Sequence, residues 1–119
     1  MKLNDYQEKA MKFAKYTNQD YPFTALVEEV GEVMGKLAKF NRKNDLTIAA
    51  SIHRAAHYGG DNYKELKTSL KKELGDALWQ LQACCSELDL SLEEVAKANL
   101  DKLSGRSERG TIIGEGDER

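Results

Sequence analysis

The stretch PFTALVEEVGEVMGKLAKFNRK, residues 22–43, decides the fold of this chain. Its apolar residues recur every three to four positions, which is the period of an amphipathic α-helix. Proline stands in the first turn, where its missing N–H breaks no helical hydrogen bond. On a helical wheel one arc holds Phe23, Leu26, Val30, Val33, Met34 and Leu37. We therefore expect a helix over about Pro22–Lys43 with one face turned to a core.

Three further segments show the same period, so the sequence predicts an all-α fold. The expected helices run over about Asp5–Thr17, Tyr63–Leu88 and Ser91–Gly105. Capping-box spacing marks their three starts: Asn4 with Gln7, Asn62 with Glu65, and Ser91 with Glu94. In the second of these helices the apolar arc holds Leu70, Leu74, Ala77, Leu78, Leu81 and Cys85. Residues 44–58 are expected to form a short helix or a packed loop, and residues 105–119, rich in glycine and charge, a loop.

Composition limits the classes of partner. The 119 residues are expected to form one domain, and their net charge of −2 lacks the basic excess of a nucleic-acid binder. No apolar run has membrane length, and the adjacent Cys84 and Cys85 suit neither a disulfide framework nor a zinc site. We expect no membrane partner and a cytoplasmic location. Because so short a chain leaves much of its surface unburied, we expect a homodimer or homotetramer.

A short acidic phrase occurs twice, as EVGE at residues 29–32 and as ELGD at residues 73–76. Both pairs of acids lie on the same flank of their helix, so antiparallel packing would bring them together. Two carboxylates about 5 Å apart repel by roughly 3 kcal/mol at an effective dielectric near 20. A hard divalent cation would relieve this repulsion, and oxygen ligands alone favour Mg²⁺, with Mn²⁺ as the alternative. The matched Gly31 and Gly75 are expected to permit close backbone approach. The simpler alternative is that all four acids are solvated.

These residues carry a resemblance to a known family. EEVGE at residues 28–32, followed by ELGD, resembles the EExxE and ExxD signature of the MazG-like all-α nucleoside triphosphate pyrophosphohydrolases. LNDYQEKA at 3–10, KKELGDALW at 71–79, NLDKL at 99–103 and RGTIIGEGDER at 109–119 are similar to the short single-domain members. The resemblance implies a MazG-like four-helix domain that oligomerisation completes.

The resemblance also implies an activity: a nucleoside triphosphate is hydrolysed between its α and β phosphates to a monophosphate and pyrophosphate. Its metal ligands map onto Glu29, Glu32, Glu73 and Asp76, and Glu28 or Glu32 would orient or deprotonate the attacking water. Enzymatic alternatives are a deoxyuridine or deoxycytidine nucleotide hydrolase and a phosphoribosyl-ATP pyrophosphohydrolase. The non-enzymatic alternative is a metal-binding helical oligomerisation module.

Near the end of the last expected helix, Asn99, Lys102 and Arg106 match the family's Asn and Lys pattern and are interpreted as phosphate-binding residues. The alternative is that Lys102 and Arg106 meet the negative end of the helix dipole. One departure concerns the 40 residues between Glu32 and Glu73, a longer gap than is usual in the family. We interpret residues 44–58 as an insertion.

Overall fold

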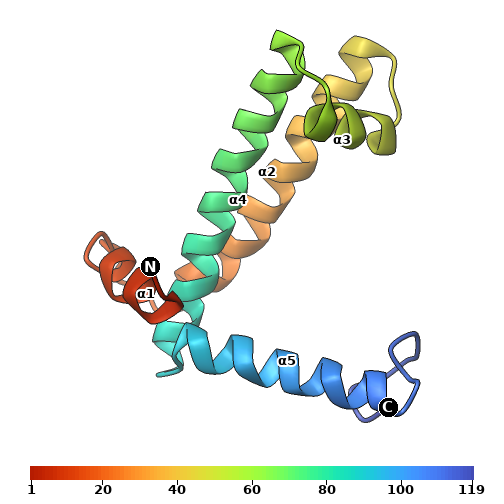
Figure 1. Ribbon diagram of the computed structural model, residues 1–119. Helices are drawn as coiled ribbons and strands as arrows, with labels where there is room; N and C mark the ends of the chain where they lie inside the picture. The colour runs from red at the N-terminus through yellow and green to blue at the C-terminus, as the bar shows by residue number, and fades with distance from the viewer. The chain divides into compact units, whose positions relative to one another are not determined.

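The computed structural model describes residues 1–119, which form five α-helices and no strand (Figure 1). The helices are α1 (Leu3–Met11), α2 (Tyr21–Asn44), α3 (Ile48–His57), α4 (Asp61–Glu87) and α5 (Leu92–Glu108). The all-α prediction is thereby confirmed. The chain divides into two compact units, one made of Met1–Ala14 with Cys85–Arg119 and the other of Lys15–Cys84. None of the helices combines the length and the apolar character that a membrane crossing requires.

The long helices α2 and α4 lie side by side and antiparallel within the unit Lys15–Cys84 (Figure 1). Their observed bounds differ by at most two residues from those expected from apolar periodicity. Pro22 is buried in the first turn of α2, and Asp45 closes that helix in the left-handed region, with φ of 49°. The start of α4 was expected to be capped by Asn62. The helix instead begins at Asp61, with the Gly60 carbonyl accepting from the amides of Tyr63 and Lys64.

Residues 48–57 form the short helix α3, so the segment 44–58 contains a helix rather than only a packed loop. Thr47 is its N-cap and accepts a hydrogen bond from the Ala50 amide. The buried Ser51 donates to the Asn41 side chain on α2, and Arg54 donates to the Tyr63 hydroxyl on α4 at 3.1 Å. Helix α3 thus makes side-chain hydrogen bonds to both long helices of its unit.

The start of α5 agrees with the sequence, but its end does not. Ser91 and Glu94 form the expected capping box. The helix was expected to stop at Gly105, yet it continues to Glu108. Gly110, with φ of 69°, supplies the left-handed residue that ends it. The amides of Gly110 and Thr111 then donate to carbonyls inside the last turn, which is the Schellman pattern.

The first helix also departs from expectation, since it spans Leu3–Met11 rather than Asp5–Thr17. Asn4 and Gln7 do not cap it. Their side-chain oxygens instead accept hydrogen bonds from the first amides of α5, Glu93 to Asn4 at 3.2 Å and Leu92 to Gln7 at 2.7 Å. The expected local capping box is therefore replaced by contacts that join α1 to α5.

The apolar faces of α2 and α4 are only partly covered within the chain. Leu37 is buried, as the wheel predicts. Six other members of the two predicted arcs are exposed by 39–57%: Phe23, Val30, Met34, Leu74, Leu78 and Leu81. The sequence therefore overestimates how much of this face the single chain buries.

Candidate metal and phosphate site

Three carboxylates from the two acidic phrases meet between α2 and α4. One carboxylate oxygen from each of Glu29, Glu73 and Asp76 lies within 4.8 Å of the other two. The antiparallel helices α2 and α4 lie side by side (Figure 1), so Glu29 of one helix can approach Glu73 and Asp76 of the other. Glu29 and Glu73 are half-buried, and Asp76 is exposed.

The electrostatics of this cluster favour the binding of a cation or a proton. Partial burial raises the pKa of Glu29, and the negative charges of Asp76, Glu28, Glu73 and Glu32 raise it further. At the observed separation each pair of ionised carboxylates repels by about 3 kcal/mol at an effective dielectric near 20, and by less where solvent screens Asp76. A proton or a cation that binds here lowers the free energy of the cluster.

The cluster has one internal counter-ion, Lys36. Its Nζ lies 3.5 Å from Glu73 Oε1, across the gap between α2 and α4. In the sequence Lys36 stands four residues after Glu32 on the same helix, and this spacing does not point to Glu73. Its partner could not be identified from that spacing, because the pairing depends on the register between two helices.

The remaining predicted acids lie at the edge of the cluster. Glu28 and Glu32 are exposed on α2, and Glu32 is not one of the three residues whose oxygens converge. Both act on Glu29 through their charge. The roles assigned to Glu28 and Glu32 stay predictions.

The predicted phosphate-binding residues lie on α5, in the other unit. Asn99 is exposed, Lys102 is partly exposed, and the Arg106 side chain is only 6% exposed. Asp117 of the C-terminal tail meets both cations: its Oδ1 lies 3.3 Å from Arg106 Nη2 and 3.6 Å from Lys102 Nζ. The helix-dipole alternative placed these cations at a helix end, and the structure adds a carboxylate there that the sequence analysis missed.

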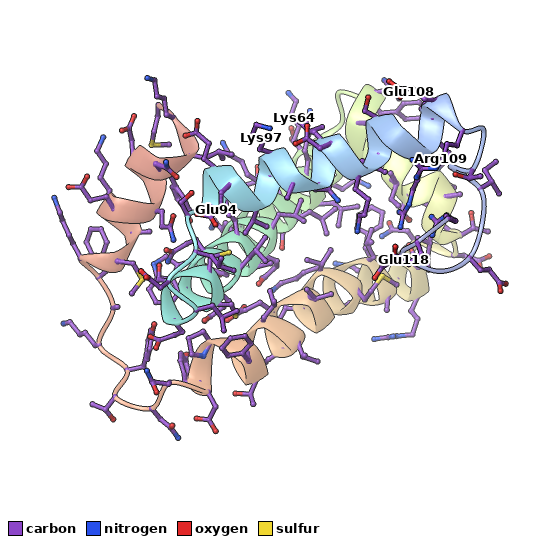
Figure 2. The ribbon with its side chains drawn as sticks, turned by 90° about the horizontal axis from the view of Figure 1, so that it is seen from below. Lys64, Glu94, Lys97, Glu108, Arg109 and Glu118 are labelled. Carbon is purple, nitrogen blue, oxygen red and sulfur yellow. The ribbon has the colours of Figure 1, made fainter.

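The tail that supplies Asp117 folds back on the last turn of α5. Arg106 Nη2 also donates to the carbonyls of Gly116 and Asp117, at 3.3 and 3.2 Å, while its buried Nε has no partner. Arg119 Nε donates to the Thr111 carbonyl at 3.0 Å. Figure 2 shows this return of the chain, with Arg109 at the end of the helix and Glu118 on the tail.

Comparison with known proteins settles the family. The model of the MazG nucleotide pyrophosphohydrolase domain matches residues 19–111. The chain belongs to the MazG family. The Gene 37 protein of Mycobacterium phage L5 is 34% identical over 99 residues, which are 83% of this chain and 75% of that protein. No solved structure is significantly similar to the chain.

The acidic cluster belongs to a nucleotide pyrophosphohydrolase domain, because the region that matches the family contains both acidic phrases and α5. The family is one of hydrolases, which supports an enzyme. The acids lie in one unit and the cations in the other, so their joint action at a single site stays a prediction.

The unit Lys15–Cys84 also holds two histidines, a tryptophan and the two glycines of the acidic phrases. His53 and His57 lie on the exposed side of α3 with their rings tilted by 53° and the ring centroids 4.8 Å apart, and no acid of the cluster is grouped with them. Trp79 packs against the edge of Tyr16, with centroids 6.3 Å apart. A Cβ atom at Gly31 or Gly75 would meet nothing within 4 Å, so the close backbone approach expected there does not occur within the chain.

Proposed function

We propose that this MazG protein is a divalent-cation-dependent nucleoside triphosphate pyrophosphohydrolase. In the proposed reaction a water oxygen bonds to the α-phosphorus, the bond from that phosphorus to the α–β bridging oxygen breaks, and pyrophosphate leaves. The products are a nucleoside monophosphate and pyrophosphate. The observation that carries the proposal is the convergence of Glu29, Glu73 and Asp76 inside the region that matches the family.

The three carboxylates fit Mg²⁺, with Mn²⁺ as the alternative. Ligand oxygens about 2.1 Å from a Mg²⁺ ion lie at most about 4.2 Å apart. The observed limit of 4.8 Å is close to this value, and small side-chain rotations would remove the difference. A bound divalent cation supplies charge neutralisation at phosphate oxygens and lowers the pKa of bound water.

The chain's own residues would position the reactants. We assign Glu29, Glu73 and Asp76 to the cation, with Glu32 as the fourth ligand expected from the family pattern. Glu28 and Glu32 are exposed beside the cluster, where either carboxylate can accept a proton from water. Asn99, Lys102 and Arg106 would hold phosphate oxygens through charge-assisted and neutral hydrogen bonds. For the two cations this requires exchange of the Asp117 carboxylate for phosphate.

We also propose that a second copy of the chain covers the open face of α2. Val27 is 74% and Met34 is 47% exposed, and Gly31 and Gly35 on the same stripe are exposed as well. Each glycine costs a helix about 1 kcal/mol relative to alanine, and at neither position does any part of the chain approach the missing side chain. Close approach by a partner helix would account for both observations. The expected assembly is a homodimer or homotetramer.

The test of function is release of pyrophosphate from a panel of ribo- and deoxyribonucleoside triphosphates with Mg²⁺. The native protein is compared with Glu73→Gln, which removes one charge of the cluster, and with Glu93→Gln, a control on the exposed start of α5. We expect turnover by the native protein and the control, and a loss of at least about 100-fold in Glu73→Gln. Folded native protein that releases neither product from any triphosphate would overturn the proposal.

A further inference from the structure

Lys36 stands where the acidic cluster borders a groove. Its Nζ lies 3.5 Å from Glu73 Oε1, yet the Lys36 side chain is 42% exposed and so remains accessible from solvent. The Glu73 side chain is only 16% exposed. Lys36 is therefore anchored on one side by a predicted cation ligand and is free to reach a second anion on the other.

The groove beside Lys36 follows one stripe of α4. Its floor is made by residues that recur every three to four positions from Asp61 to Glu73, and Lys36 of α2 forms the facing wall. The groove has a volume of about 560 Å³. Its length along the helix, from Asp61 to Glu73, is about 18 Å at a rise of 1.5 Å per residue.

Hydrogen-bond donors gather at the end of this groove next to the cluster. Lys36, Lys72, Thr68 and Ser69 lie there, Glu65 lies one turn further from the cluster, and Asp61 and Lys64 line the far end. The one carboxylate at the near end, Glu73, belongs to the set that would hold the cation. Two ammonium groups and two hydroxyls suit an anion with many oxygens that is bound to that same cation.

We propose that this groove binds the β and γ phosphates of the nucleotide, and hence the leaving pyrophosphate, with Lys36 as the residue that selects a triphosphate. This rests on the proposed function. Without ligand Lys36 neutralises Glu73. When a cation takes over Glu73, the ammonium of Lys36 turns to a phosphate oxygen in the groove. A nucleoside monophosphate has no group that reaches this position, so Lys36 contributes nothing to its binding.

Loss of the Lys36 charge therefore acts in opposite directions on two ligands. Mg²⁺ alone competes with the Lys36 ammonium for Glu73, so Lys36→Met binds Mg²⁺ at least as tightly as the native protein. Pyrophosphate loses a charge-assisted hydrogen bond, so at saturating Mg²⁺ its affinity falls by about tenfold or more. A purely structural role of Lys36 would weaken both ligands together.

The experiment is calorimetric titration of the full chain with Mg²⁺, and then with inorganic pyrophosphate at saturating Mg²⁺. Lys36→Met is compared with the native protein and with Lys39→Met, an exposed lysine on α2 that does not line the groove. We expect weaker pyrophosphate binding in Lys36→Met alone, and partial recovery in Lys36→Arg. Circular dichroism checks that each variant keeps its helices.

The outcomes separate this inference from the proposed function, because pyrophosphate binding requires no turnover. If pyrophosphate fails to bind the native protein, binds Lys36→Met equally well, or weakens equally in both lysine variants, the groove assignment is overturned, even where nucleotide hydrolysis is observed. If pyrophosphate binding depends on Lys36 while no triphosphate is hydrolysed, the groove assignment holds and the proposed reaction fails.

Discussion

The buried guanidinium of Arg106 lies 3.3 Å from the carboxylate of Asp117, which is itself exposed to solvent. The same oxygen lies 3.6 Å from Lys102 Nζ, so one tail carboxylate serves both cations that we assign to phosphate. An anion that binds Lys102 and Arg106 must therefore compete with Asp117. A substitution of Asp117 therefore tests whether Lys102 and Arg106 bind phosphate.

Asp117→Asn removes the competing charge and keeps the side chain's size. We expect the KM for a nucleoside triphosphate to fall by about three- to tenfold, since a charge-assisted contact of about 0.7–1.4 kcal/mol no longer has to be exchanged. Steady-state kinetics measure this, with Glu115→Gln as the control because it removes a neighbouring exposed charge of the same tail. An unchanged or higher KM in Asp117→Asn would contradict phosphate binding by this pair of cations.

The raised pKa of Glu29 predicts a pH dependence of stability. Because the folded state holds the Glu29 proton more tightly than the unfolded chain does, the stabilisation is full below the ordinary value of 4.5 and is lost as pH rises through the raised pKa. Glu29→Gln should therefore be more stable than the native protein at pH 7 without divalent cation, and the difference should shrink below pH 4.5. Urea unfolding at both pH values measures it.

The same substitution tests cation binding. At Mg²⁺ about 100-fold above its Kd, the native protein should gain about 2.7 kcal/mol of stability. Glu29→Gln should gain little, because one of the three converging ligands has become neutral. Equal stabilisation of both proteins by Mg²⁺ would show that the cation binds elsewhere.

Gly31→Ala tests whether a second copy of the chain covers the exposed face of α2. In an isolated chain the new methyl group meets nothing within 4 Å, so helix propensity alone should raise stability by about 0.5–1 kcal/mol. In the proposed assembly the methyl group stands between two helices, and the oligomer should dissociate at higher protein concentration than the native one. Analytical ultracentrifugation over a concentration series distinguishes these results. A variant that is more stable and assembles unchanged would place the interface elsewhere.

Gln7→Leu tests the hydrogen bonds that connect α1 to the start of α5. Gln7 accepts from the Leu92 amide and donates to Ser86 Oγ and the Leu90 carbonyl, both at 3.0 Å. Loss of these contacts leaves part-buried backbone groups unpaired and should cost about 1–3 kcal/mol. Urea unfolding compares the variant with Gln19→Leu, a change at an exposed loop position. Equal stability of the two variants would mean that water replaces the Gln7 contacts without loss.

Helix bounds that depend on local interactions were predicted correctly from the sequence. The bounds of α2 and α4 and the cap at Ser91 follow from apolar spacing and from side chains within one turn of the helix end. The end of α5 was missed because Gly105 is tolerated inside the helix, while Gly110 offers the positive φ that the stop requires. Two glycines compete there, and the tail's contacts with Arg106 favour the later one.

The part of the candidate site that depends on spacing within a helix was predictable from the sequence. Spacing and antiparallel packing placed Glu29, Glu73 and Asp76 together. The partner of Lys36 and the position of Asp117 depend on the register between two helices and on the path of a loop, neither of which appears in a single-helix pattern. For the same reason the Asn4 and Gln7 spacing was misread, because their side chains serve a helix some 85 residues away.

Tyr63 connects helix α3 to both long helices of its unit. Its ring lies 6.0 Å from that of Phe40 on α2 and 5.6 Å from that of Tyr58 at the end of α3, and its hydroxyl accepts from Arg54. A relative without α3 would leave the Tyr63 hydroxyl without Arg54 and the Asn41 side chain without Ser51, although Phe40 would still contact the Tyr63 ring. Such a relative would need compensating changes at positions 41 and 63, so these two positions should vary together with the length of the segment between α2 and α4.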